Sequence, residues 1–352
     1  MKTIIATPAR PGFGFNGLLA AAAVALIVLV ASMKAAPQAA AGVQPPDLRD
    51  TGLYADFEIG EIDARHLAFS PQYPLWTDGA TKRRWISLPP GSAIDASDPD
   101  AWVFPVGTRL WKEFSFEGRR VETRVMERQA DGQWRYAAYA WSADWSTAQL
   151  VPERGKRGAY PLGGGRSHTI PGVNDCKACH QGGRGEVLGF GLIQLAPDLD
   201  GLIARGLLVG LPPSARAVRW TAASTTERAA AGYLHGNCGH CHNEQGPLRN
   251  LALFLRQTAA DGSERAIAST FDQAVKKPAP GLPADAVLRI EPEHPERSAL
   301  LKRIASRYPP LQMPPLGTEL IDRQAVDLLS RWIAESEPVS PSTHRPEKGP
   351  TQ

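Results

Sequence analysis

The sequence has little cysteine and methionine and no strong excess of charge. Its 352 residues include four Cys and four Met, and the formal net charge is only +3. That excess comes from Lys2, Arg10 and Lys34, because residues 1–36 contain no acid, and the remainder of the chain has a formal net charge of 0 (+3 − 3). A neutral body has no global basic surface for nucleic acid or lipid. We therefore expect no nucleic-acid partner, and any electrostatic docking must use local patches.

Two common kinds of active site are also missing from the sequence pattern. The glycine run at 163–165 has neither the strand and helix context nor the Gly-Lys-Ser/Thr ending that a phosphate loop requires. Acids of the first half, such as Asp78, Glu113 and Asp144, have no His or Ser partner at motif spacing. The sequence therefore predicts no phosphate loop and no hydrolase site.

The four cysteines lie in two copies of the pattern C-x-x-C-H, at 176–180 and 238–242. In this pattern two thiols form thioether bonds to the haem vinyl groups, and the next residue offers an imidazole to the iron. Cys residues three apart project to the same side of a helical turn, which places the adjoining His beneath the ring. The predicted cofactors are two covalently bound haem c groups. Their predicted binding residues are Cys176, Cys179 and His180 for the first, and Cys238, Cys241 and His242 for the second.

Other uses of two C-x-x-C pairs agree less well with the spacing. A structural zinc site needs its pairs about 15–20 residues apart, whereas 58 residues separate Cys179 from Cys238. A thioredoxin-like redox pair needs a βαβ setting, which the sequence does not indicate. The chain has eight His. The probability that a His follows both pairs by chance is therefore roughly one in two thousand. Covalent haem is the interpretation that we favour.

The first 36 residues have the pattern of an export signal. Lys2 and Arg10 precede an uncharged apolar run at 17–30, and the Ala-rich sequence that follows supplies small residues of the kind found at cleavage sites. The run has the length of a signal-peptide core and is short for a membrane span. We expect a periplasmic protein, with residues 1–36 as a signal peptide or as an uncleaved anchor that tethers it to the inner membrane through residues 17–33. In either case the body is exported.

The fold class expected is α+β, and its first part is an antiparallel β domain at 48–160, a sandwich or barrel, after a linker at 37–47. Strand signals at 108–116, 119–128 and 133–141 are separated by Glu117-Gly118 and Asp131-Gly132 turns. Apolar and charged residues alternate in 119–126, as in a strand with one solvent-exposed face. Seven of the nine Trp lie in this domain. We interpret them as core, with an aromatic binding platform as the alternative.

The second part is expected to be a mainly α-helical dihaem cytochrome c region. Residues 161–225 are a first haem segment, reached through a flexible connector at 155–170 and containing a helix over 199–209. A capped helix begins at Thr225 or Thr226 and runs into Cys238, and a last helix spans 322–335. The proline-rich tail at 338–352 is predicted to be disordered.

Residues 226–337 resemble a class I cytochrome c, in which a helix carries C-x-x-C-H, a proline-rich loop follows (here 313–317), and a last helix closes the domain. The resemblance implies that the first and last helices cross, with Gly232 and Tyr233 against Leu329 and Trp332. It also implies that Met313, 71 residues after His242, is the sixth ligand of the second iron. The surrounding prolines restrict the backbone of this loop, and His/Met ligation raises the potential of a haem.

The sixth ligand of the first iron stays open at this point. Besides Met1, Met33 and Met313, the only methionine is Met126, in a predicted strand. His168, eight residues before Cys176, is the candidate that we favour, and Met126, His235 or an open position are the alternatives.

Over residues 50–335 the chain resembles a family of exported dihaem c-type cytochromes with an N-terminal β-rich domain. Besides the haem motifs, the stretches that carry this resemblance are 73–78, 170–175 and 233–237. It implies electron transfer between a redox partner, a dehydrogenase or another cytochrome, and a downstream cytochrome or oxidase. Two alternatives remain: a peroxidase-type dihaem enzyme with an open first iron, and a β domain that binds a ligand. We expect an electron-transfer protein rather than a catalyst.

Overall fold

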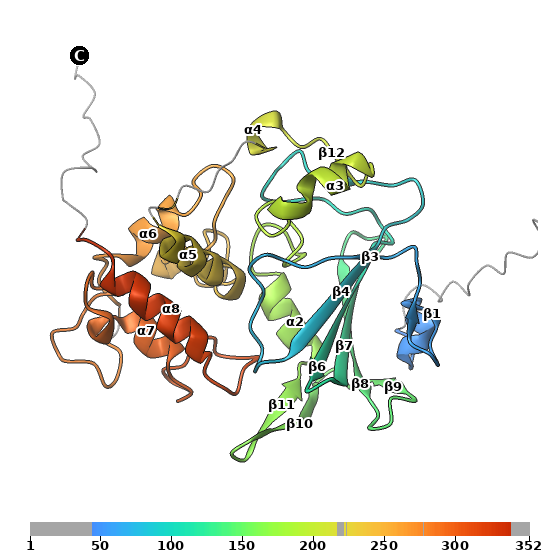
Figure 1. Ribbon diagram of the computed structural model, residues 1–352, viewed down its shortest axis with the longest axis horizontal. Helices are drawn as coiled ribbons and strands as arrows, with labels where there is room; N and C mark the ends of the chain where they lie inside the picture. The colour runs from blue at the N-terminus through green and yellow to red at the C-terminus, as the bar shows by residue number, and fades with distance from the viewer. Residues whose placement is uncertain (1–43, 217–221, 223, 277, 339–352) are drawn as a thin grey trace, which may run out of the picture. The chain divides into compact units, whose positions relative to one another are not determined.

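The structure, a computed structural model, describes residues 44–216, 222, 224–276 and 278–338. The predicted signal or anchor and all but the first residue of the predicted tail lie outside these ranges. An antiparallel sheet occupies the N-terminal part, and helices dominate the later part (Figure 1). The expected α+β class is therefore confirmed.

The strands are β1 (Tyr54–Asp56), β2 (Glu61–Ile62), β3 (Leu67–Ala68), β4 (Thr81–Ser87), β5 (Ile94–Asp95), β6 (Arg109–Phe116), β7 (Arg119–Arg128), β8 (Trp134–Trp141), β9 (Ala148–Leu150), β10 (Lys156–Gly163), β11 (Arg166–Ile170) and β12 (Leu208–Val209). The α-helices are α2 (Val173–His180), α3 (Leu199–Ala204), α4 (Pro213–Arg216), α5 (Thr225–Asn237), α6 (Glu264–Thr270), α7 (Ala299–Ile304) and α8 (Arg323–Ala334). Short 3₁₀ helices are η1 (Leu48–Thr51), η2 (Ala196–Asp198), η3 (Arg249–Leu251) and η4 (Pro295–Arg297).

The main sheet has six antiparallel strands in the order β3-β4-β6-β7-β8-β9. The hairpins predicted around 117–118 and 131–132 are confirmed, and Glu117 and Gly118 both have positive φ (50° and 78°), which two-residue hairpin turns of this twist require. The sheet is open, with β3 and β9 as its edges. The expectation of a sandwich or barrel is therefore wrong, because the main sheet does not close on itself and the other sheets within the described ranges have only two strands each.

One face of the main sheet is an aromatic core. Trp111 and Tyr139 are almost completely buried there and pack with Leu48, Leu53 and Trp141. Five of the seven tryptophans of this part are buried, namely Trp85, Trp102, Trp111, Trp134 and Trp141. The core interpretation of the tryptophans is confirmed, since only a few indole rings are left to form an exposed platform.

The opposite face carries the charged residues of β7, and it is not solvent-exposed as the alternation suggested. Glu122 is 0% exposed, and Arg124 is only partly exposed. Two later elements cover this face: α2 packs against β8, and His168 of β11 contacts Glu122. The prediction was wrong because alternation shows that two faces differ in polarity but not what covers each one.

Residues 155–170 form the hairpin β10–β11 rather than a flexible connector. Tyr160 and His168 are paired across it. Its turn contains Gly163, Gly164 and Gly165, which have φ values of 82°, 57° and 74°. The glycine run thus supplies the left-handed backbone that this turn needs.

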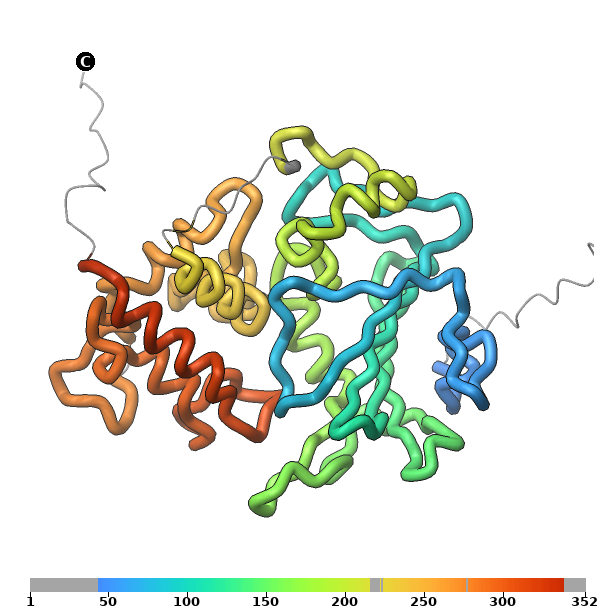
Figure 2. The backbone as a smooth tube through the Cα atoms, in the orientation of Figure 1, coloured from blue at the N-terminus to red at the C-terminus, as the bar shows by residue number. Residues whose placement is uncertain are grey.

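A loop between β3 and β4 reaches across to the helices of the second half (Figure 2). The Trp76 N–H donates to Asn237 Oδ1 (2.7 Å), and Asp78 Oδ1 accepts from the N–H groups of Glu319 and Leu320 (2.8 Å each). The Tyr73 ring lies against Gly232, where an added Cβ would be 2.1 Å from Tyr73 Cε1. Direct hydrogen bonds therefore join the β-rich part to the C-terminal part.

The long helices begin and end much as their sequences predict. Ser224, one residue before the predicted start, caps α5 by accepting from Glu227 N (3.1 Å), and Asp322 caps α8 by accepting from Ala325 N (3.1 Å). The predicted helix over 199–209 is shorter: α3 ends at Ala204, and Gly206 (φ 66°) leads into β12.

The predicted contact between the first and last helices is present in part. Leu329 and Trp332 of α8 pack in one cluster with Leu234 and Tyr233 of α5. Gly232, which was expected to face α8, instead makes room for Tyr73. Sequence reasoning missed this because Tyr73 is more than 150 residues away in the chain.

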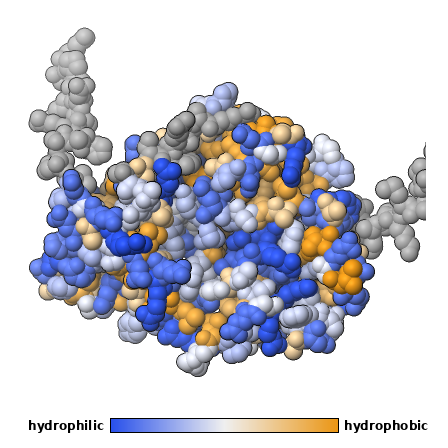
Figure 3. Space-filling view, in the orientation of Figure 1, coloured by the Kyte–Doolittle hydropathy of each residue, from blue (hydrophilic) through white to orange (hydrophobic). Residues whose placement is uncertain are grey.

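The visible surface mixes hydrophilic and hydrophobic residues, with hydrophobic residues gathered over α3 and β12 (Figure 3). Val209 of β12 is 49% exposed. In the ranges that the structure describes, no helix combines the length and apolar character needed to cross a bilayer.

Candidate functional site

The first C-x-x-C-H motif lies on α2, which packs against β8 of the main sheet. Gly172 is the capping residue before the helix, and its N–H donates to Asp175 Oδ2 (2.9 Å). Gly172 is required here because an added Cβ would be 2.2 Å from the Glu153 carbonyl oxygen. Cys176 packs against the apolar cluster that contains Met126 and Tyr136. The motif is thus a short helix backed by the sheet.

His180 ends this helix with its ring held in one orientation. Its Nδ1 is 2.7 Å from the Glu186 carbonyl oxygen, and its ring centroid is 5.3 Å from that of Tyr136. Because Nδ1–H donates to the carbonyl, Nε2 keeps a free lone pair, as in metal-binding imidazoles. Burial, helped by the nearby charge of Lys112, lowers the pKa of His180 to about 4. The imidazole is therefore neutral, the form that binds metals.

The second motif follows directly from the C-terminal end of α5. The Cys238 N–H donates to the Leu234 carbonyl (2.9 Å), and the His242 N–H donates to the Cys238 carbonyl (2.9 Å). The His242 carbonyl in turn accepts from Leu255 N (2.8 Å). These bonds hold the motif as a continuation of the helix, anchored to the 253–255 segment.

A cavity of about 550 Å³ opens beside the second motif. Its lining includes Cys238, Cys241 and His242. Most of the other lining residues are apolar, namely Leu248, Leu251, Leu253, Leu255, Val275, Ala299, Leu300 and Ile304, with Pro314 and Pro315 at one side. Pockets for organic cofactors typically have volumes of about 300–1,000 Å³ and apolar walls. Size and lining both suit a haem.

His242 lines this cavity and has one buried ring nitrogen without a hydrogen-bond partner in the described parts of the chain. The residue is 7% exposed, and its Nδ1 is buried without a hydrogen-bond partner among the described residues. Burial, followed by the charge of Arg289, lowers its pKa to about 4. The imidazole is therefore neutral, the form that binds metals, and the residue lies in the cavity wall.

Met313 lines the same cavity as His242, in the loop predicted to supply the sixth ligand. Its backbone N–H donates to the Arg303 carbonyl (3.0 Å), which ties the loop to α7. Pro314 and Pro315 follow it in the cavity wall. The residues predicted for the second haem, Cys238, Cys241, His242 and Met313, are thus brought together.

The two motifs lie next to each other in space although 57 residues separate them. Asn243 Nδ2 donates to the Gly182 carbonyl (3.0 Å), two residues after the first motif, and to the carbonyls of Gly239 (2.9 Å) and His240 (3.1 Å). Cys241 Sγ is 3.9 Å from the Ala178 carbonyl oxygen. Gly182 has no room for a side chain, because an added Cβ would be 2.4 Å from the His240 carbonyl oxygen.

Sequence reasoning missed Asn243, Glu186 and Tyr136 as parts of the site. Asn243 comes directly after the second motif, which is the one local signal that could have pointed to it. The Glu186 contribution is a backbone carbonyl, and Tyr136 reaches His180 only through tertiary packing. Neither leaves a trace in the sequence.

His168, the sixth ligand favoured for the first iron, is already engaged by carboxylates. It is 1% exposed, its Nε2 is 2.8 Å from Glu122 Oε2, and its Nδ1 is 3.9 Å from Asp78 Oδ2. Burial would lower its pKa, but hydrogen bonds to Asp78 and Glu122 raise it above its usual value. Each ring nitrogen that bonds a carboxylate is used in that contact and is not offered to a metal. In this structure His168 is engaged by Glu122 and Asp78, and its role as a ligand of the first iron stays a prediction.

The other two candidates for the first iron differ in position. Met126 belongs to the cluster against which Cys176 packs, and it pairs across the strands with Tyr136. His235 has its Nδ1 occupied, since it accepts from Gln257 N (3.0 Å). Of the side chains considered, Met126 is the one placed beside the first motif.

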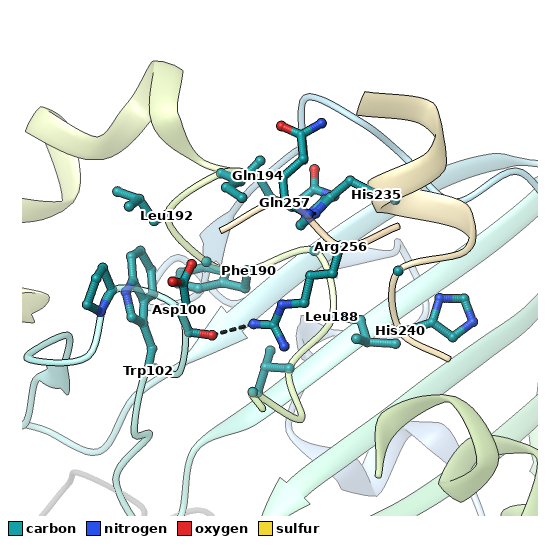
Figure 4. A pocket seen from close by; sticks show the side chains of 18 of the residues that line it. Asp100, Trp102, Leu188, Phe190, Leu192, Gln194, His235, His240, Arg256 and Gln257 are labelled. Carbon is teal, nitrogen blue, oxygen red and sulfur yellow. Dashed lines mark hydrogen bonds between the residues drawn. The ribbon is translucent and has the colours of Figure 1, made fainter. Parts of the chain in front are cut away.

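A smaller cavity of about 100 Å³ lies near the second motif (Figure 4). Trp102, His235 and His240 are among its lining residues, and Arg256 donates to the Asp100 carbonyl across it. His240 lines both cavities. The smaller cavity is well below the usual volume of a cofactor site.

In the parts of the chain that the structure describes, no group of three or more His, Cys, Asp or Glu side chains is arranged to hold a metal ion. A haem needs only one or two iron ligands from the protein, with the cavity and thiols beside them, and the second motif has this arrangement. Comparison of the chain with protein-family models, curated proteins and solved structures finds no match.

Proposed function

We propose that this chain is an exported protein with two covalently bound haems that passes single electrons from one redox protein to another. The observation that carries the proposal is the junction made by Asn243, which brings two haem-attachment motifs into direct contact. Two separate carriers would not need such a junction, whereas a relay needs its centres close together. When bound at each motif, haem supplies an iron that gains and loses one electron.

The cysteines hold the two groups through chemistry that needs no oxidant. Each thiol adds across a vinyl double bond: the sulfur bonds to one carbon, the thiol hydrogen goes to the other, and one thioether forms. Burial raises the pKa of Cys176 and Cys179 to about 11 and that of Cys238 to about 12. The free thiols are therefore protonated at neutral pH, so they add little negative charge to the buried site.

The histidines and Met313 orient and tune the two irons. His180 is fixed by its bond to the Glu186 carbonyl, and such bonds set the ring orientation and basicity of a ligand. His242 and Met313 line one cavity, which supports His/Met ligation and a class I cytochrome c-like domain over 226–337. Apolar walls exclude water there and favour the less charged, reduced state.

The N-terminal pattern of the sequence supports export. We infer that residues 1–36 direct the body to the periplasm, either as a cleaved signal or as a tether through residues 17–33. The electron donor is then a periplasmic dehydrogenase or cytochrome, and the acceptor a cytochrome or oxidase. The β-rich part positions the first motif, since α2 rests on its sheet.

The proposal is tested by purifying the full chain from cells that attach haem to C-x-x-C-H. Denatured protein extracted with acidic solvent should keep its colour and contain two haems per chain. A redox titration should then resolve two one-electron steps, and variants with both Cys of one motif replaced by Ala should lose one step each. Colour that washes off the denatured chain, or protein without iron, overturns the proposal.

A second candidate is a peroxidase-type enzyme with an open first iron. The engagement of His168 by Glu122 and Asp78 favours it, because the sixth ligand that we expected is not free. The two functions separate on one measurement: stoichiometric binding of cyanide or carbon monoxide at one haem, together with turnover of peroxide, supports the enzyme. A relay with both irons fully ligated does neither.

A further inference from the structure

Three cations stand side by side on the sheet face that α2 covers. Arg84 of β4 lies directly opposite Lys112 of β6, and Lys112 lies directly opposite Arg124 of β7. Arg84 is only 9% exposed. Like charges at directly opposed positions destabilise a sheet, and buried cations are costly without a partner. We call Arg84, Lys112 and Arg124 the cationic row.

The row lacks enough acid to balance it. Arg124 pairs with Glu122, but Glu122 also accepts from His168. In the described parts of the chain, Arg84 and Lys112 make no ion pair and no side-chain hydrogen bond. Lys112 contacts the face of the Phe114 ring at 4.9 Å, which compensates only a part of a desolvated charge. Among the described residues, Arg84 and Lys112 are therefore left without a direct ion-pair partner, although the charge of Glu122 acts on Lys112 from a distance.

Lys112 and Arg124 of the row lie beside the first motif, and Arg84 is the neighbour of Lys112 on the next strand. Side chains two residues apart share a face of a strand, so Lys112 and Arg124 are on the face that also carries Met126 and, by the strand register, Tyr136. The Tyr136 ring contacts His180, and Cys176 packs against the same cluster. The charges of Lys112 and Arg124 also act on His180. The uncompensated charge thus faces the place where the first haem would be attached.

We propose that the cationic row binds the carboxylates of the haem attached at Cys176 and Cys179, with Arg84 and Lys112 as the two positioning cations. The inference rests on the proposed function, since it needs a haem at the first motif. A haem carries two propionate carboxylates, which match the two cations that lack a direct ion-pair partner within the described ranges. A charge-assisted bond to a carboxylate is also the strongest pairing open to a buried Arg or Lys.

The test compares Lys112→Gln, which removes a charge of the row, with Lys112→Arg, which keeps it. Arg119→Gln is the control, because Arg119 is an exposed cation at the start of β7 in the same sheet. All are prepared as the full chain with haem attached and are first assayed for two haems per chain. Fewer than two haems in the wild-type chain contradicts the proposed function, before any potential is measured.

Midpoint potentials and oxidised-minus-reduced infrared spectra are then recorded. For Lys112→Gln we expect one haem to shift to lower potential, with a change on the order of threefold to tenfold in its ferrous/ferric ratio at a fixed applied potential, because a nearby positive charge favours the ferrous state. The carboxylate bands should change in Lys112→Gln, return in Lys112→Arg and stay unchanged in Arg119→Gln. If Lys112→Gln does not fold with two haems, Arg84→Gln is used with the same expectations.

Two results would overturn the inference. If the potential shifts while the carboxylate bands stay identical, the cation acts through space and holds no propionate. If the wild-type potential shifts on addition of phosphate at constant ionic strength, the row holds an exchangeable anion instead.

Discussion

The two C-x-x-C-H sites have the same residue types at the same spacing but very different surroundings. The first lies on a short helix against a sheet that presents the cationic row, and its His180 is held by a backbone carbonyl. The second follows a long helix into a largely apolar cavity, and its His242 has no partner for Nδ1. The comparison teaches that a C-x-x-C-H motif does not by itself set its surroundings. The second cavity also has cations in its wall, namely Lys276, Arg289 and Arg303, beside its apolar residues. If each site holds a haem, the different arrangements of charge and apolar burial should give the two haems different potentials.

The largest effect should come from Met313→Ala, which removes the proposed sixth ligand of the second site alone. We expect the sulfur-to-iron absorption band in the far red to disappear, one haem to become able to bind carbon monoxide, and its potential to fall by about 60 mV or more, a tenfold change in the one-electron equilibrium. The matched change at the first site is Met126→Leu. If Met126→Leu removes the band and Met313→Ala does not, the two sites have been assigned the wrong way round.

The next effect concerns the loop that connects the two halves. Gly232→Ala places a Cβ about 2.1 Å from the Tyr73 ring, so α5 and the loop must move apart, at a cost of about 3 kcal/mol in unfolding free energy. Chemical denaturation measures it. The control is Gly201→Ala in α3, where nothing lies within 4 Å of the added Cβ and stability should stay equal or rise. Equal behaviour of both variants would show that Tyr73 does not pack against α5 in solution.

A smaller loss is expected where the two sites meet. Asn243→Ala removes the donor shared by the carbonyls of Gly182, Gly239 and His240, and buried acceptors left unpaired should cost about 2 kcal/mol. Asn174→Ala, at an exposed position of α2, serves as the control. We also expect slower electron exchange between the two haems of Asn243→Ala in flash reduction. If the unfolding free energy and the electron-exchange rate both stay unchanged, Asn243 does not couple the two sites.

The smallest effect is a pH dependence of the unfolding free energy, which comes from the cluster of His168, Asp78 and Glu122. The pKa of His168 is raised above 6.5 by Asp78 and Glu122, against the effect of burial, so its contribution is complete below pH 6.5 and is lost as the pH rises through the folded value. Burial would raise the pKa of Glu122, but Arg124 and His168 lower it below 4.5, so its contribution is complete above pH 4.5. The cluster should therefore stabilise most between pH 4.5 and 6.5.

The test is the unfolding free energy as a function of pH. The wild-type value should decline above pH 6.5, and His168→Gln should be less stable at pH 6 without showing that decline. A variant that keeps the same slope would show that His168 does not titrate with folding. If His168→Gln instead changes the spectrum of one haem while folding normally, His168 is a ligand after all.

Some features follow from the sequence because their causes are local. The hairpins of β6, β7 and β8 were predictable from alternating residues and from turn residues such as Gly118, which tolerate positive φ. The starts of α5 and α8 were predictable to within about one residue, because a cap bonds a backbone group three residues away. The six Cys and His residues of the two motifs were likewise predictable, because the C-x-x-C-H spacing alone identifies them.

Other features were decided by tertiary structure because their partners are far apart in the chain. The alternating charges of β7 predicted a wet face, but α2 and β11 cover it and turn Glu122 and His168 into a buried pair. No pattern in the sequence predicts the hydrogen bond from Asn243 to Gly182 or the contact of Tyr73 with Gly232. These contacts depend on how whole elements pack. By itself the sequence determined the two C-x-x-C-H motifs, because that pattern needs only neighbours along the chain. The fold decided which charged and apolar side chains surround each motif, and that the two motifs lie side by side. Those contacts join residues tens to hundreds of positions apart.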